Sequence, residues 1–124
     1  MAKVLIVDDE PNIVLSLEFL MRKDGHEVQS APDGARALAL AERFRPDLVL
    51  LDVMMPGMDG YEVCRRLRAG AAGGSPRIVM LTAIGGDGAA QQGTLAGADL
   101  YVTKPFSTRE LLADIGRLIP EHRA

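Results

Sequence analysis

The sequence contains very little cysteine or histidine. Cys64 is the only cysteine among 124 residues, which excludes an intrachain disulfide and any metal motif built from paired cysteines. The two histidines, His26 and His122, lack the spacing of metal ligands, and we expect both at the surface. Cys64 is expected to pack on the helix predicted around it. A chain of this length buries roughly two thirds of its unfolded surface, so a stable core needs neither disulfides nor metals.

Long hydrophobic runs and basic clusters are also missing. The N-terminal stretch MAKVLIVDDE has four apolar residues in a row before three acids, which is too short for a signal peptide or a membrane span. A formal net charge of -3 without a Lys/Arg cluster argues against a nucleic-acid surface. We therefore predict a cytoplasmic protein that binds neither membranes nor nucleic acid directly.

Internal repeats and interdomain linkers are absent too. Hydrophobic residues make up 48% of the chain and charged residues 25%, which is ordinary for a globular domain. Residues 1–124 are therefore interpreted as a single domain. The chain ends directly after its last predicted helix, so we expect either a stand-alone protein or a domain taken from a longer one.

Five short apolar runs predict five strands. Several runs are continuous rather than alternating, which is typical of strands covered on both faces. The runs are Val4–Val7, Val28–Ala31, Leu48–Leu51, Ile78–Leu81 and Leu100–Val102. Segments with helical spacing lie between them. This alternation predicts a doubly wound α/β fold, with a mostly parallel sheet and helices on both faces.

Most of the predicted helices have recognisable starts. Pro11 suits the first turn of one helix, and Asp33 and Asp59 are expected to cap the next two. Ser107 opens a capping box before the last helix. The helix before that one is predicted to be weak, because the stretch AIGGDGAAQQGTLAGAD holds five glycines and each costs up to ~1 kcal/mol inside a helix. We expect it to start late, near Ala89, and to fray.

Polar residues fall where the predicted strands end. Asp8 and Asp9 follow the first strand, Asp52 ends the third, Thr82 ends the fourth and Lys104 follows the fifth. The carboxyl ends of parallel strands meet at one edge of the sheet, which is the edge where open α/β sheets bind ligands. One by one these residues have simpler roles as helix caps, turn residues or loop charges. Together they predict one site.

The charges of this predicted site favour a divalent cation. Repulsion among three carboxylates should raise the pKa of at least one of them, and Lys104 supplies only one positive charge. Oxygen ligands with open water positions suit Mg²⁺ or Mn²⁺. A carboxylate neutralised in this way can attack phosphorus, and a lysine, a hydroxyl and a cation can stabilise the phosphoryl oxygens.

Four segments resemble a known family. VLIVDDEP, LLDVMMPGMDG, MLTA and YVTKPF look like the signature blocks of response-regulator receiver domains, the phosphoacceptors of two-component signalling. The resemblance covers nearly the whole chain. It implies a flavodoxin-like (βα)5 fold with a five-stranded parallel sheet of order 2-1-3-4-5. It also implies phosphoryl transfer from a sensor histidine kinase or a phosphotransfer protein.

The resemblance implies a role for each matching residue. Asp52 would be the phosphoacceptor, and Mg²⁺ would be bound by Asp8, Asp9, Asp52 and the backbone carbonyl of Met54. Thr82, the backbone N–H of Ala83, and Lys104 would contact the phosphoryl group. Tyr101 would be the aromatic switch residue, although half-buried packing is its simpler explanation. The peptide bond from Lys104 to Pro105 would be cis. The output surface would comprise the last two helices and the strand between them, and the output partner stays unknown.

Three other functions fit this sequence less well. An aspartyl-phosphate phosphatase of the haloacid-dehalogenase type would carry a proton-shuttling acid two residues after Asp52, where this chain has Met54. A flavodoxin-like nucleotide or flavin binder would need a phosphate loop after the first strand, where this chain has acids. A receiver with a structural duty only would lack some of the key residues, and here all are present.

Two departures from the family's usual patterns give further expectations. Leu100 and Asp114 replace the charges with which winged-helix regulators usually dimerise, so we expect no such dimer and a more apolar surface at Leu100. Met54 and Ile84, two residues after Asp52 and Thr82, are apolar and bulky. They should hinder an attacking water, so we expect an acyl phosphate that lasts many minutes.

Overall fold

The computed structural model describes residues 2–70, 75–83 and 87–119. Its centre is a parallel sheet of five strands in the order β2-β1-β3-β4-β5, which confirms the predicted topology. The strands are β1 (Lys3–Val7), β2 (Glu27–Ala31), β3 (Leu48–Asp52), β4 (Arg77–Thr82) and β5 (Leu100–Thr103). Ile84, His122 and the glycines at 85 and 86 lie outside the described residues, so the expectations that concern them stay predictions.

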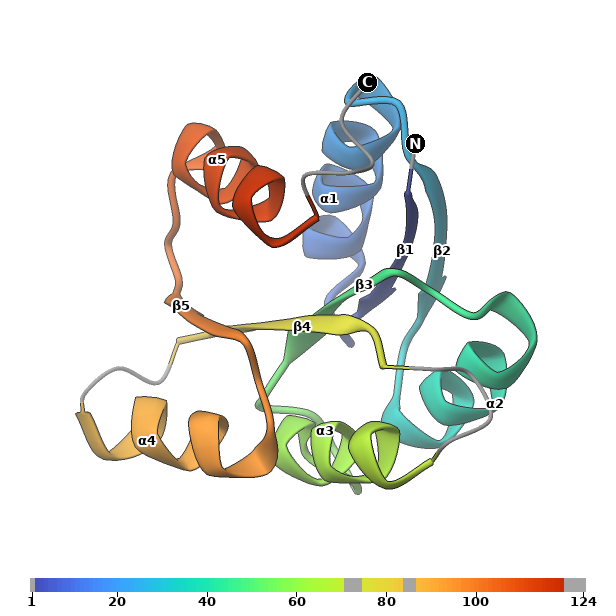
Figure 1. Ribbon diagram of the computed structural model, residues 1–124. Helices are drawn as coiled ribbons and strands as arrows, with labels where there is room; N and C mark the ends of the chain where they lie inside the picture. The colour runs from blue at the N-terminus through green and yellow to red at the C-terminus, as the bar shows by residue number, and fades with distance from the viewer. Residues whose placement is uncertain (1, 71–74, 84–86, 120–124) are drawn as a thin grey trace.

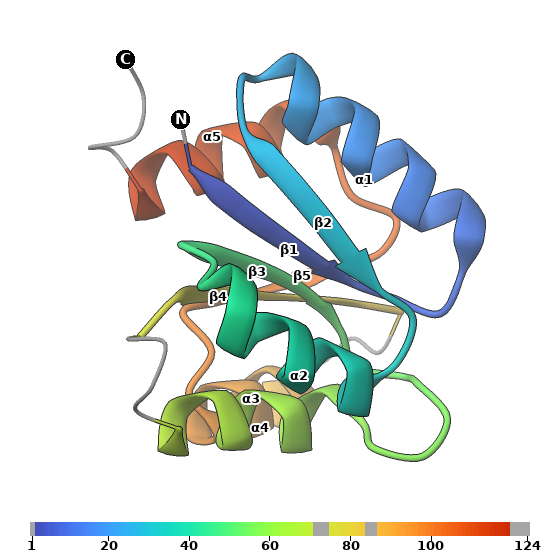
Figure 2. The same cartoon turned by 90° about the vertical axis from the view of Figure 1, so that its right-hand side faces the viewer.

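Helices cover both faces of the sheet. α1 (Pro11–Lys23) and α5 (Thr108–Leu118) lie on one face, whereas α2 (Gly34–Phe44), α3 (Gly60–Ala69) and α4 (Asp87–Ala96) lie on the other (Figures 1 and 2). Each face has its own hydrophobic cluster, and the strand residues contribute to the two clusters alternately. Leu5 and Val7 belong to the cluster under α2 to α4, whereas Val4 and Ile6 belong to the other. This double coverage explains why the strands read as continuous apolar runs.

The helix starts follow from capping side chains. Asp33 accepts a hydrogen bond from the Arg36 N–H at 2.8 Å, and Asp59 accepts one from the Glu62 N–H at 2.9 Å. Ser107 accepts one from the Glu110 N–H at 3.2 Å. Each bond satisfies an N–H group that has no partner inside its own helix. The three predicted caps are thus confirmed. Among the described residues, no helix combines the length and the apolar character that a membrane span requires.

Two predictions were wrong, one about the start of α4 and one about the exposure of His26. α4 begins at Asp87 rather than near Ala89, so Gly88 and Gly93 both lie inside the helix. His26 is not a surface residue, because only 6% of it is exposed. Its Nδ1 accepts a hydrogen bond from the Ala2 N–H at 3.1 Å, so Nε2 carries the ring proton and faces Asp24 at 3.2 Å. Burial is tolerated because both ring nitrogens have partners.

Candidate functional site

The residues predicted to form one site lie at the same edge of the sheet. Asp8 directly follows β1, Asp52 is the last residue of β3, and Thr82 is the last residue of β4. Lys104 directly follows β5, and its N–H donates to the Thr82 carbonyl at 2.6 Å. β1 and β4 are the two neighbours of β3 in the sheet, which places Asp52 at the centre of this edge. The parallel topology therefore brings together residues that are almost 100 positions apart, since the Asp8–Lys104 hydrogen bond spans 96.

Three carboxylates form the acidic part of the site. Asp8 and Asp52 are buried, with 2% and 4% of each residue exposed, whereas Asp9 is exposed to solvent. One oxygen atom from each of the three lies within 4.8 Å of the others. Opposite ligands of an octahedral Mg²⁺ lie about 4.2 Å apart, since each bond is about 2.1 Å long. The three side chains therefore fit a small divalent cation with little movement, and all their donor atoms are oxygens, as Mg²⁺ requires.

Lys104 provides the positive charge at this edge. Its Nζ lies 3.1 Å from Asp8 Oδ2 and 3.6 Å from Asp52 Oδ1. Burial disfavours the ammonium form, but the hydrogen bond to Asp8 and the charges of Asp8 and Asp52 outweigh it and raise the pKa of Lys104. The peptide bond to Pro105 is cis, as the resemblance implied. Lys104 is therefore charged and points toward both buried carboxylates.

Asp52 has the most perturbed carboxyl group of the site. Burial is the main cause that raises the pKa of Asp52 from 3.8 to about 6, and the negative charge of Asp8 adds to it. Lys104 and the backbone N–H of Met54 oppose this rise. The prediction that one carboxylate would have a raised pKa is thus confirmed, although desolvation contributes more than repulsion. An anionic Asp52 at neutral pH costs free energy that a bound cation would recover.

The segment after Asp52 turns sharply because two glycines permit it. Gly57 has a φ of +76°, which favours glycine, and a Cβ atom on Gly60 would overlap the Asp52 carbonyl oxygen. The Gly60 N–H donates to the Val53 carbonyl at 2.9 Å, so α3 begins against the end of β3. Met55 packs inside, whereas 61% of Met54 is exposed to solvent.

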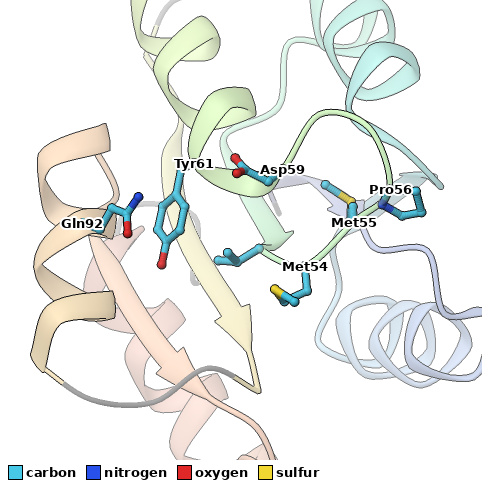
Figure 3. A pocket seen from close by; sticks show the side chains of 7 residues that line it. Met54, Met55, Pro56, Asp59, Tyr61 and Gln92 are labelled. Atoms are coloured by element: carbon cyan, nitrogen blue, oxygen red, sulfur yellow. The ribbon is translucent and has the colours of Figure 1, made fainter.

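A cavity opens beside this turn, between the β3–α3 loop and α4. Its volume is about 480 Å³, and Figure 3 shows the side chains around it. Most of the lining comes from the loop after Asp52 and the start of α3. The lining residues are Val53, Met54, Met55, Pro56, Asp59, Tyr61 and Gln92. Sequence reasoning gave no indication of this cavity.

Hydroxyl groups extend from the site toward β5. Thr82 is fully buried, Ala83 is exposed, and Tyr101 is half-buried. The Thr82 and Tyr101 side chains are hydrogen-bonded, and burial is the main cause that raises the pKa of Tyr101. The Tyr101 hydroxyl also lies 3.5 Å from that of Tyr61, a buried residue of α3. Tyr61 was missed by sequence reasoning, since a tyrosine after Asp59-Gly60 carries no signal of a partner 40 residues away.

A family model for the response regulator receiver domain matches residues 4–116. The chain belongs to this family. Among solved structures, it is similar to the chemotaxis protein CheY4 of Vibrio cholerae, with 36% identity over 95% of this chain and 98% of that one, and a TM-score of 0.89. The BeF3-activated receiver domain of RstA from Klebsiella pneumoniae is 33% identical over 94% and 97%, with a TM-score of 0.88.

A third similar structure has a metal ion. It is the receiver domain of the sensor histidine kinase PA1611 from Pseudomonas aeruginosa, with a magnesium ion in its active-site cleft. It is 34% identical to this chain over 96% and 98%, with a TM-score of 0.87. The protein is thus a receiver domain of two-component signalling with the flavodoxin-like fold that the sequence predicted. The comparisons give no support to the phosphatase alternative.

Proposed function

We propose that Asp52 accepts a phosphoryl group from a phosphohistidine of a sensor histidine kinase or a phosphotransfer protein. The observation that carries the proposal is the position of this buried carboxylate at the centre of the sheet edge, 3.6 Å from a lysine. Of the carboxylates in the described residues, Asp52 is the one whose pKa is raised to about 6. The one positive charge of Lys104 is shared by two carboxylates, Asp8 and Asp52. A bound divalent cation would balance the remaining negative charge.

The reaction requires one bond to form and one to break. An Asp52 oxygen forms a bond to phosphorus while the bond from phosphorus to the donor histidine nitrogen breaks, and the leaving imidazole keeps the electron pair. The product carries about one more negative charge than the carboxylate. Lys104 balances this charge, whereas the Thr82 hydroxyl and the Ala83 N–H donate to phosphoryl oxygens. Positioning and electrostatics of this kind supply most of the catalysis in phosphoryl transfer.

Asp8, Asp9, Asp52 and the backbone carbonyl of Met54 are the proposed ligands of Mg²⁺ or Mn²⁺. The spacing of the three carboxylates and their oxygen donor set support this assignment. When bound, the cation supplies charge that lets an anionic donor approach three carboxylates. Asp9 is the exposed member of the group, so it can take up the ion from solvent while Asp8 holds Lys104.

The donor is proposed to dock on α1 beside the acidic cluster. Leu15 and Phe19 lie one helical turn apart on this helix with 64% and 69% exposed, and they line one surface cavity together, so they form an apolar patch. Leu15 also lines a cavity of about 320 Å³ that Asp8 and Asp9 share. An apolar helix from the donor could cover these side chains and bring its histidine to Asp52. Such a donor would place the reaction in the cytoplasm.

The output is proposed to be a change in the surface of α4, β5 and α5, with Tyr101 as the switch residue. Leu95 on α4 is 80% exposed and Leu100 on β5 is half-buried, so this surface offers apolar area to a partner protein. Turnover as a phosphatase is not proposed, because Met54 cannot carry a proton at the position two after Asp52. The partner acts either as a separate protein or as a further domain, and direct binding of nucleic acid or membrane by this chain is not proposed.

Intact-mass measurement after incubation with acetyl phosphate and MgCl₂ tests the proposal. We expect one phosphoryl group per chain, lost with EDTA and lost in Asp52→Asn. Asp59→Asn is the matched control, because Asn caps a helix about as well as Asp and Asp59 lies outside the cluster. It should be phosphorylated like the wild type. An adduct that survives Asp52→Asn, or that forms equally well in EDTA, would overturn the assignment.

A further inference from the structure

The Tyr101 ring is held by residues from two helices on the same face of the sheet. Gly93 of α4 lies against the side of the ring, and Tyr61 of α3 meets its hydroxyl. Thr82, at the end of β4, is hydrogen-bonded to that hydroxyl as well. The ring is therefore directed inward, toward the neighbouring elements.

Gly93 provides the space that the ring occupies. A Cβ atom at position 93 would lie 2.9 Å from Cδ1 of Tyr101 and 3.2 Å from the sulfur of Met80. Gly88, in the same helix, differs, because a Cβ atom there would meet nothing within 4 Å. Both glycines lower the stability of a helix by up to ~1 kcal/mol relative to alanine. Of these two glycines, only Gly93 also leaves space that the Tyr101 ring occupies.

Tyr61 links the ring to the strand that carries Asp52. Its residue is 6% exposed, and it follows Gly60, which packs directly on the Asp52 backbone. The side chain of Tyr61 therefore starts from a fixed position beside the end of β3. Its hydroxyl lies 3.5 Å from the Tyr101 hydroxyl, at the far limit of a hydrogen bond. The contact is weak enough to be changed by a small movement of either ring.

The hydroxyls of Thr82, Tyr101 and Tyr61 can form a chain of hydrogen bonds that runs in either of two directions. Each hydroxyl donates one hydrogen bond and accepts others. With Asp52 unmodified, Thr82 can donate to Tyr101, which in turn donates to Tyr61. If the Thr82 hydroxyl turns to donate to a phosphoryl oxygen, the same chain can run from Tyr61 through Tyr101 to Thr82. The inward ring keeps its partners in both cases.

We propose that Gly93 and Tyr61 are positioning residues that hold the Tyr101 ring inward before Asp52 is modified. The surface of α4 and β5 is then already biased toward one of its two arrangements, and modification at Asp52 strengthens this bias. The consequence for output rests on the proposed function of Tyr101 as the switch residue. The proposed positioning role of Gly93 and Tyr61 does not, since it concerns the protein before any modification and is tested there.

NMR of the protein with ¹³C-labelled tyrosine tests the proposal. The chain has two tyrosines, so Tyr61→Phe leaves a single signal and assigns both. A paramagnetic agent dissolved in the buffer broadens each ring signal according to its exposure. We expect Tyr61→Phe to shift the inward-to-outward ratio of Tyr101 about twofold toward outward, as the loss of one weak hydroxyl hydrogen bond implies. Unchanged broadening of Tyr101 in Tyr61→Phe would overturn the role of Tyr61.

Gly93→Ala and Gly88→Ala form a matched pair. Both replace glycine by alanine within α4, and only the first places a methyl group in the space of the ring. We expect stronger broadening of Tyr101 in Gly93→Ala and wild-type broadening in Gly88→Ala. The same result in both variants would mean that helix propensity, rather than the space for the ring, controls Tyr101. Tyr61→Phe remains decisive if Gly93→Ala does not fold.

These measurements separate the two proposals. They are made in EDTA on unmodified protein, so they do not depend on whether Asp52 accepts a phosphoryl group. Wild-type protein that forms no adduct, but whose Tyr101 responds to Tyr61→Phe, would remove the proposed function and keep the positioning role. An adduct on Asp52 together with an unresponsive Tyr101 would do the reverse.

Discussion

The amino ends and the carboxyl ends of the strands form two edges of the sheet, here called the amino edge and the carboxyl edge. The charged side chains at these two edges are paired differently. At the amino edge, Asp99 accepts hydrogen bonds from the Ile78 N–H at 2.7 Å and from Arg68 at 2.8 Å, and it lies 3.5 Å from Arg77. Arg68 also donates to the Gly97 carbonyl at 2.8 Å. At the carboxyl edge, three carboxylates form a cluster, and in the described part of the chain one lysine, Lys104, pairs with two of them, Asp8 and Asp52. One edge is balanced by fixed partners, and the other keeps an excess of negative charge.

The contacts at the amino edge stabilise the fold, whereas the buried charge at the carboxyl edge lowers its stability. The Arg68 and Asp99 side chains join the end of α3, the start of β4 and the start of β5. Loss of Asp99 would remove an acceptor that both Arg68 and the Ile78 N–H use. The carboxyl edge instead keeps Asp52 buried with a raised pKa, which is a cost in the absence of a cation. Clusters of this kind are typical of functional sites.

The largest expected effect comes from a substitution that removes the charge of Asp52. In EDTA, Asp52→Asn should raise the free energy of unfolding at about pH 8 by up to about 3 kcal/mol, the equivalent of a shift from 3.8 to about 6. The folded state keeps the Asp52 proton up to about pH 6, whereas the unfolded chain releases it near pH 3.8. The wild type therefore loses stability from this group as the pH rises through that window. Urea denaturation of both proteins across the window measures the difference.

The difference between the two proteins should shrink as the pH falls and vanish below pH 3.8, the lower of the two pKa values. There Asp52 is neutral in both the folded and the unfolded wild type, so Asn and a protonated Asp are nearly equivalent. A constant advantage of Asp52→Asn at every pH would contradict the electrostatic explanation, since shape alone would then account for it.

The next effect concerns the amino edge. Asp99→Ala should lower the free energy of unfolding by about 2 kcal/mol, because the Ile78 N–H and Arg68 lose a charged acceptor. Glu62→Ala is the matched control: Glu62 pairs with Arg65 and Arg66 as closely, but on an exposed helix surface. Its loss should have a clearly smaller effect. Equal losses in urea denaturation would mean that the Asp99 contacts act as ordinary surface pairs.

The two edges also differ in how far they could be read from the sequence. The carboxyl edge was predictable, because Asp8, Asp52 and Thr82 directly follow apolar runs and parallel strands end at a common edge. The helix caps at Asp33 and Asp59 were predictable as well. Each depends on a hydrogen bond to a residue three positions away, so the signal is local.

The remaining contacts depend on how the elements pack. The Arg68–Asp99 pair spans 31 residues, the Tyr61–Tyr101 contact spans 40, and the His26 hydrogen bond to Ala2 spans 24. Nothing in the local sequence distinguishes these side chains from ordinary surface or core residues.

The smallest expected effect comes from adding a divalent cation to the acidic cluster at the carboxyl edge. MgCl₂ at about five times its dissociation constant should raise the free energy of unfolding of the wild type by about 1 kcal/mol, since only the folded chain presents the cluster. Asp52→Asn and Asp9→Asn should each lose most of this gain. NaCl at matched ionic strength separates binding from screening, because screening also reduces the repulsion among the carboxylates. Equal stabilisation by NaCl would mean that the negative excess is merely screened, whereas a gain specific to Mg²⁺ and dependent on Asp9 would identify this edge as a cation site.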